Sequence, residues 1–347
     1  MLNKLKHLIT IYNFCIGITV FMLAGINLAH AERNYTYVLT VKMDANDPNY
    51  DPNTNYNTIN SAIVAMNTKS PPLAADRLGV IRVYNGIYVE QLNSSQDGND
   101  LPAHCDLIGM GMQIADVEIY HTSPSGSYIY VPGVNCISDN VVSHLKIYNP
   151  SGNNSQVGIY FRGDGTLDNC IVSGVHGPAV EGYGHLIVKG AGTEISTYYR
   201  SCIRADSTFE IYDCNLKPKT FSLVGQGPGG IDARGSGIID GVTISCPYGL
   251  TKEEYTILTG IVISISDDEY VKILNTNINL HLTSKYYPTQ PPPVMEMSML
   301  IQSIMMVPIP PPHILPVMIA TISFPLWPPT ITTSRHITLI MATRGLI

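Results

Sequence analysis

The stretch Gly79–Leu92, "GVIRVYNGIYVEQL", holds two short apolar segments on either side of an Asn-Gly turn. The alternation in its second half is typical of a strand, and two strands around a tight turn would form a hairpin. The preceding residues 56–67, "YNTINSAIVAMN", follow a different pattern. Their apolar residues recur at the spacing of an amphipathic helix: Ile59, Ala62, Ile63 and Met66. The order of elements is therefore one helix followed by many short strands.

Composition limits the class of protein. The chain has 347 residues, of which 45% are hydrophobic and 14% charged, so it is long enough to bury a large core. Its net charge of −7 gives no basic surface for nucleic acid. Residues 1–31 resemble a secretory signal, with two lysines, an apolar run and a small-residue cleavage site, Ala29-His30-Ala31. We expect removal of this segment and a secreted or cell-surface protein, although a retained membrane anchor is the alternative.

The cysteines are scattered. Cys15 falls in the signal, and the other six form no C-x-x-C pair: Cys105, Cys136, Cys170, Cys202, Cys214 and Cys246. This pattern predicts no zinc site. We expect buried free thiols rather than a disulfide framework, and neither a metal nor a cofactor.

Short segments repeat between residues 105 and 280. They include "LDNCIV" (167–172), "IYDCNL" (211–216), "IIDGVTI" (238–244) and "ILNTNI" (273–278), marked by Asn169, Asp213, Asp240 and Asn275. A period in the twenties with Asn or Gly at the corners is typical of a solenoid. Stacked coils bury a continuous apolar core that one coil cannot form alone. The sequence predicts an all-β fold, a right-handed parallel β-helix with an N-terminal capping helix, over 32–285; a β-sandwich is the alternative.

The opening stretch resembles the start of pectin lyase-like β-helices, and of pectin methylesterases in particular. In those proteins an "F-x-T-I-x-x-A-I" helix leads to "V-x-I-x-x-G-x-Y-x-E" and then to "L-x-G-x-G". Here the corresponding segments are "YNTINSAIVAMN", "GVIRVYNGIYVEQL" and "DLIGMG" (106–111). Further on, "SQVGIYFRGDGTLDNCIVSG" (155–174) resembles that family's glutamine-bearing coil, with Gln156 at the glutamine position. The resemblance covers about residues 56–280.

The resemblance implies ester hydrolysis by two aspartates on neighbouring coils, helped by glutamines and an arginine. A carboxylate nucleophile needs a cationic neighbour, and the acid needs a raised pKa. The family motifs "Q-D-T", "D-F-I-F-G" and "L-G-R-P-W" are absent here. Their positions fall at His176-Gly177-Pro178, near Glu194, and at apolar residues before Asp267. Glu194 is one residue out of register, which on a strand reverses the face. Gln156 and Glu194 are the catalytic candidates that remain.

Other residues are candidates for substrate binding: His176, Tyr198, Arg200 and Arg204. The two arginines resemble a lyase basic cluster, or simply bracket a coil corner and pair with Asp206. Tyrosines along a solenoid suit sugar stacking but pack equally well between coils.

The end of the chain has a different composition. Residues 286–347 hold twelve of the 24 prolines and seven of the 13 methionines. The prolines interrupt each apolar run, so none spans a membrane. We expect this tail to be disordered or to be the product of a shifted reading frame.

These observations predict a secreted pectinesterase-like protein that interacts with pectin-like or other acidic polysaccharide in the cell wall, with its catalytic motifs lost. The partner is polysaccharide, with no nucleic acid and no membrane after signal cleavage. An active esterase, lyase or hydrolase with non-standard residues (Glu194, Asp206 and Arg204) is one alternative. A structural surface protein is another.

Overall fold

The structure is a computed structural model. It describes residues 33–90, 92, 99–120, 131–149, 156–198, 200–218, 229–250, 261–263, 270–283, 294–306, 320–323 and 336–339. The chain divides into residues 1–36 and 37–347, and the coils below belong to the second unit. The predicted signal segment lies outside the described residues. None of the helices described is long and apolar enough to cross a membrane.

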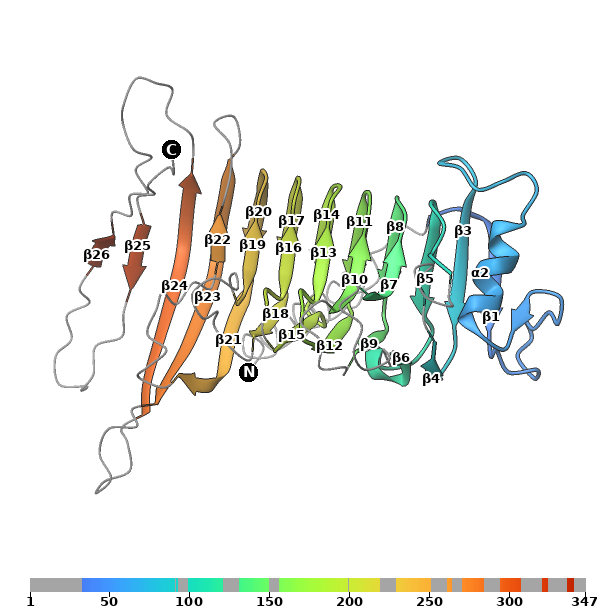
Figure 1. Cartoon of the computed structure of the whole chain (residues 1–347), viewed down its shortest axis with the longest axis horizontal. Coiled ribbons are helices and arrows are strands. Elements are labelled where there is room, and N and C mark those ends of the chain that lie inside the picture. Colours follow the sequence, from blue (N-terminus) through green and yellow to red (C-terminus); the bar gives the residue numbers. More distant parts are fainter. Residues whose placement is uncertain are drawn as a thin grey trace, which may run out of the picture. The chain divides into compact units, whose positions relative to one another are not determined.

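Successive coils place their strands in three parallel ladders, and Figure 1 shows the strands of successive coils following one another. Sheet I contains β3 (Leu78–Val83), β5 (Cys105–Gly109), β8 (Asn140–Ser143), β11 (Gly165–Asp168), β14 (Leu186–Lys189), β17 (Phe209–Tyr212) and β20 (Gly237–Asp240). Sheet II contains β4 (Gly86–Val89), β6 (Val117–Tyr120), β9 (Lys146–Tyr148), β12 (Ile171–Val175), β15 (Glu194–Thr197), β18 (Asn215–Pro218) and β21 (Thr243–Leu250). The long β23 (Val271–Thr283) ends the parallel part of both sheets.

The third ladder, sheet III, has six strands. They are β7 (Val131–Cys136), β10 (Gln156–Phe161), β13 (Val180–Gly182), β16 (Ile203–Ala205), β19 (Ile231–Ala233) and β22 (Ile261–Ile263). Most inward residues of the three sheets are apolar and buried, and the polar Asn140 of β8 and Thr197 of β15 are buried among them. The predicted right-handed parallel β-helix is confirmed, because β3 and β4 each pair in parallel with the next coil rather than with each other.

The N-terminal end is covered by α2 (Ile59–Asn67), which follows the short strands β1 (Tyr35–Val41) and β2 (Asn55–Tyr56). The helix buries the predicted face Ile59, Ala62, Ile63 and Met66. Thr58 caps it by accepting from the Ser61 amide. The Glu90 carboxylate accepts from two first-turn amides, Ile59 at 2.9 Å and Asn60 at 2.8 Å. A carboxylate there also suits the positive end of the helix dipole.

From β8 onward, the corner between sheets I and II contains a residue with positive φ. These residues are His144, Asn169, Gly190, Asp213, Gly241 and Asn275. Such backbone favours Gly, Asn and Asp, which explains the repeat seen in the sequence. One predicted marker is wrong by a single position: Asp240 is the last residue of β20, and Gly241 (φ 68°) makes the turn.

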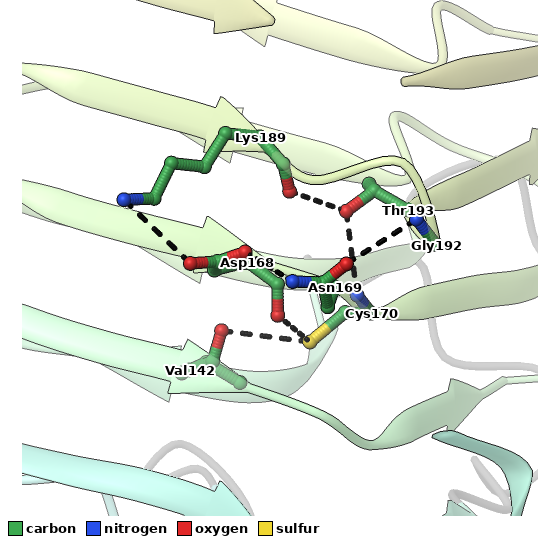
Figure 2. Close-up of polar contacts among 7 residues, drawn as sticks. All are labelled: Val142, Asp168, Asn169, Cys170, Lys189, Gly192 and Thr193. Atoms are coloured by element: carbon green, nitrogen blue, oxygen red, sulfur yellow. Dashed lines mark hydrogen bonds and ion pairs between the residues drawn. The ribbon is translucent and has the colours of Figure 1, made fainter. Parts of the chain in front are cut away.

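Figure 2 shows how one corner is held. The Asn169 amide nitrogen donates to Asp168 Oδ1 at 2.8 Å, and its oxygen accepts from the Gly192 amide of the next coil at 3.2 Å. Lys189 Nζ lies 3.6 Å from Asp168 Oδ2. These contacts stabilise the corner and link it to the next coil, so the role of Asn169 and Asp168 is structural.

The residue after most of these corners is buried in the core, but after Gly190 the next residue, Ala191, is exposed and Thr193 takes the inward position. Cys170 and Cys214 occupy this position two coils apart, with Thr193 between them, and all three are buried. Five cysteines are free and buried, as predicted: Cys105, Cys136, Cys170, Cys202 and Cys214. The side chain of Cys246 lies outside the described residues. Burial raises the pKa of the Cys170 and Cys214 thiols to about 12.

Other elements complete the description. The 3-10 helix η1 (Ile114–Asp116) precedes β6. In the C-terminal segment, β24 (Val294–Met306), β25 (Ala320–Ser323) and β26 (His336–Leu339) follow β23 as an antiparallel series. A shifted reading frame for residues 286–347 stays a prediction.

Candidate binding face on sheet III

The outer face of sheet III carries two rows of polar side chains. The first row runs through Asn135, Tyr160, Glu181, Arg204 and Asp232, which stand opposite one another on successive strands. The second row lies two residues further on, where backbone bonds continue the same pairing through Arg162, Tyr183, Asp206 and Arg234. Side chains two apart on a strand share a face. Both rows therefore face outward together. Figure 1 shows the strands that carry them, β10, β13, β16 and β19, in successive coils.

The inward positions between these two rows are occupied by small residues. Gly182, Ala205 and Ala233 fill the inward position between the two rows. A Cβ at Gly182 would come within 3.0 Å of the Leu186 side chain, so the interior has little room for a larger residue there.

Arginines and carboxylates alternate across neighbouring coils. Arg204 Nη1 lies 3.1 Å from Glu181 Oε1, and its Nη2 lies 3.0 Å from Asp206 Oδ2. Arg234 Nη2 lies 2.9 Å from Asp232 Oδ2, and its Nε lies 3.5 Å from Asp206 Oδ1. Burial lowers the pKa of Arg204, but Glu181 and Asp206 outweigh this effect and the pKa is raised.

A second, looser ion pair lies at the N-terminal end of the face. Arg162 Nη2 is 3.5 Å from Asp100 Oδ2, and Asp100 Oδ1 accepts from the Asn135 side chain at 2.8 Å. Guanidinium groups bind carboxylates through a planar fork of donors, so each arginine retains donors that can meet a further acceptor.

The two signs of charge lie at different depths. The side chains of Asp100, Glu181, Asp206 and Asp232 are only 1–12% exposed. Those of Arg162, Arg204 and Arg234 are 25–49% exposed. The carboxylates sit beneath and the guanidinium groups above, so a ligand on this face would meet cations first.

Two tyrosines lie among the arginines. The rings of Tyr160 and Tyr183 meet edge to face with centroids 5.4 Å apart. Tyr183 is 47% exposed. Burial, followed by the nearby Glu181 carboxylate, raises the pKa of both phenols. Both therefore keep the hydroxyl proton at neutral pH and can donate it to a ligand oxygen.

The structure places the predicted substrate-binding residues at three separate positions. Arg204 pairs with Asp206, as predicted, but it lies mid-strand in β16 rather than at a corner. His176 and Tyr198 stack on neighbouring coils with ring centroids 4.6 Å apart and an interplanar angle of 25°. Arg200 is exposed. The binding roles of these residues stay predictions.

The two predicted catalytic residues lie on different sheets. Gln156 begins β10 in sheet III, and the direction of its side chain lies outside the described residues. Glu194 begins β15 in sheet II and forms an ion pair with Lys217 of the next coil. In sheet III, β13 pairs with β16, with Val180 opposite Ile203, so β15 with its Glu194 is not part of this sheet. A catalytic role for Gln156 and Glu194 stays a prediction.

Sequence reasoning missed most of the sheet III face: Arg162, Glu181, Tyr183, Asp232 and Arg234. A four-residue pattern would have found them, since each strand reads apolar, polar, inward, polar. The instances are "IYFR" (159–162), "VEGY" (180–183), "IRAD" (203–206) and "IDAR" (231–234). The repeat in the sequence is clearest at the corner between sheets I and II. That corner does not include the sheet III strands, so the repeat does not reveal these residues.

Among the described residues, no three His, Cys, Asp or Glu side chains gather as metal ligands.

The coils define the class of fold: the chain is a right-handed parallel β-helix. No protein-family model and no curated protein matches the sequence. Two crystal structures of a pectin methylesterase from Aspergillus niger, one deglycosylated and one penultimately deglycosylated, are similar to it. In each case identity is 19%, the TM-score is 0.43, and the match covers 70% of this chain and 77% of the other. One fold hosts many functions, so an activity has to be argued from the site.

Proposed function

We propose that this β-helix binds a pectin-like acidic polysaccharide along the outer face of sheet III, without hydrolysing its methyl esters. The observation that carries the proposal is the layering of this face, with half-exposed arginines and Tyr183 above buried carboxylates.

The chemistry of the face suits a chain of uronates. Each uronate carries one carboxylate, which a guanidinium recognises through paired hydrogen bonds. An exposed aromatic ring such as that of Tyr183 offers apolar surface to one face of a sugar, and its hydroxyl bonds to the rim. Arg162 and Arg234 stand three coils apart, about 14 Å at the usual strand spacing. The ligand thus fits as an extended chain that follows the solenoid.

The proposed loss of esterase activity is supported by the residues at the positions that the pectin methylesterase resemblance assigns. Gly177 and Pro178 carry no carboxylate, and Glu194 lies on another sheet in a pair with Lys217. A covalent mechanism has no turnover without its nucleophile.

An enzyme with non-standard residues is the second candidate. Glu181, Asp206 and Asp232 lie on the same face in adjacent coils, and carbohydrate-active enzymes commonly use paired carboxylates. Their burial beneath arginines argues against it, because a catalytic group must reach the substrate.

Two assays on the same preparation test the proposal. Electrophoresis through gels that contain polygalacturonate should retard the protein, whereas gels with fully methylated pectin should retard it far less. Methanol release from methylated pectin should stay at the blank.

Each result discriminates. Equal mobility in all gels contradicts the binding proposal. Methanol release above the blank contradicts the loss of activity, and its disappearance in Glu181→Gln or Glu194→Gln would identify the carboxylate responsible.

A further inference from the structure

We propose a second glycan-binding site, for an uncharged polysaccharide, on the outer face of sheet II at β4, β6 and β9. It consists of Val89, Tyr120 and Tyr148, which stand opposite one another on these three strands, with Ile87 beside them. We call these residues the tyrosine strip. It is separate from the face of sheet III and does not depend on the function proposed above.

The strip is an open aromatic and aliphatic surface. Ile87 and Val89 are 64% and 66% exposed, large fractions for apolar side chains. The rings of Tyr120 and Tyr148 follow on the next two coils, partly exposed, with centroids 5.4 Å apart and an interplanar angle of 51°. An aromatic ring and exposed aliphatic groups present the apolar surface that the C–H face of a sugar ring prefers.

The next coil is shaped to receive the Tyr148 ring. A Cβ at Gly174 would lie 2.6 Å from Cε2 of Tyr148, and Gly174 has φ of +79°, which other residues rarely adopt. The glycine leaves room for the ring to extend over β12. The Tyr148 ring thereby extends the tyrosine strip from β9 over β12.

The charges beside the strip cancel. Lys146 Nζ lies 3.0 Å from Glu118 Oε2 and 5.2 Å from the centroid of the Tyr148 ring. A carboxylated sugar would gain little from a lysine already neutralised in this way. An uncharged sugar finds here both donors and acceptors for its hydroxyls. The site therefore favours a neutral glycan, in contrast to the arginine-lined sheet III.

The dimensions favour a single polysaccharide chain over a protein partner. Two rows on a strand lie about 7 Å apart, and the three strands span two strand spacings, about 10 Å. Their product is on the order of 100 Å², far below the roughly 800 Å² per partner of a stable protein interface. A chain one sugar wide needs no more than this width.

The experiment is a calorimetric titration of the full protein with three neutral probes: cellohexaose, xylohexaose and mannohexaose. We expect at least one to bind. Tyr148→Ala should weaken that binding by about tenfold or more, and Tyr148→Phe by less than about threefold, since the ring remains. Tyr212→Ala is the matched control, a partly exposed tyrosine on sheet I, and should change nothing.

Two further readouts keep the test decisive. If Tyr148→Ala does not fold, Tyr120→Ala takes its place, and the shift of tyrosine ring resonances on titration of the unaltered protein reports the same contact. Tyr183→Ala should leave neutral binding unchanged, so failure on one face is distinguished from failure on the other. No binding of any neutral probe, or binding that survives both alanine substitutions, overturns the proposal.

Discussion

Arg204 Nη1 lies 3.1 Å from Glu181 Oε1, and the two residues stand directly opposite each other on β16 and β13. Glu181 is almost fully buried, and the same arginine also reaches Asp206. Arg204 therefore neutralises two carboxylates on neighbouring positions of the face. The stability of this region depends on it.

Arg204→Met should destabilise the protein by about 3–5 kcal/mol, because it leaves a buried carboxylate without its partner. Urea unfolding followed by circular dichroism measures the change. Arg200→Met, at an exposed position, should cost less than about 0.5 kcal/mol. The double variant Glu181→Gln/Arg204→Met should recover part of the loss. No recovery would mean that packing of the arginine, not charge, is responsible.

The N-terminal cap makes a similar prediction. Glu90→Ala removes the acceptor of the Ile59 and Asn60 amides at the start of α2. The expected cost is about 1–3 kcal/mol, the penalty for unsatisfied donors. The matched control is Glu210→Ala, a 39%-exposed carboxylate on sheet I. Equal destabilisation by both substitutions would show that the cap contributes nothing specific.

The buried thiols predict a loss of stability in alkali. Burial raises the folded-state pKa of Cys170 and Cys214 from 9.0 to about 12. Because the folded-state pKa is raised, the contribution of these thiols to the free energy of unfolding is full below pH 9. It is lost as the pH rises toward 12. Each thiol loses roughly 1.4 kcal/mol per pH unit in that range.

Urea midpoints between about pH 8 and 9.5 test this, below the ordinary tyrosine pKa of about 10. The Cys170→Ala/Cys214→Ala variant is less stable throughout but should show a shallower decline. Parallel curves for the two proteins would show that these thiols are not the cause.

Much of this fold follows from local rules. The helix face at Ile59–Met66 and the corners at Asn169, Asp213 and Asn275 were visible because helix periodicity and positive-φ turns select residue types strongly. The marker at Asp240 failed by one residue because Gly241, not the aspartate, makes the turn.

The sheet III face was harder to predict. Glu181, Arg204 and Asp232 lie 23 and 28 residues apart, and they meet only because the coils between them close to the right length. Coil lengths vary here, so no fixed period aligns the three charges. A single charged residue per strand also looks like ordinary surface until its neighbours in space are known.

Ionic strength distinguishes the two proposed sugar sites. Binding of polygalacturonate depends on exposed arginines and should weaken about tenfold or more between 50 and 500 mM NaCl, since salt screens such charges. Binding of a neutral hexasaccharide at the tyrosine strip should hardly change. Titration calorimetry at the two salt concentrations gives both values. Salt-independent binding of polygalacturonate would contradict the role of the arginines.

The central claim is that the arginines and Tyr183 on sheet III hold an acidic polysaccharide. Titration of polygalacturonate oligomers into the double variant Arg162→Gln/Tyr183→Ala tests it most directly. The matched control is Arg77→Gln/Tyr270→Ala, with a 35%-exposed arginine and a tyrosine that, like Tyr183, is 47% exposed. The account predicts an affinity at least about tenfold weaker for the first variant and unchanged for the second, with both folded. Equal affinities for the two variants and the unaltered protein would contradict it.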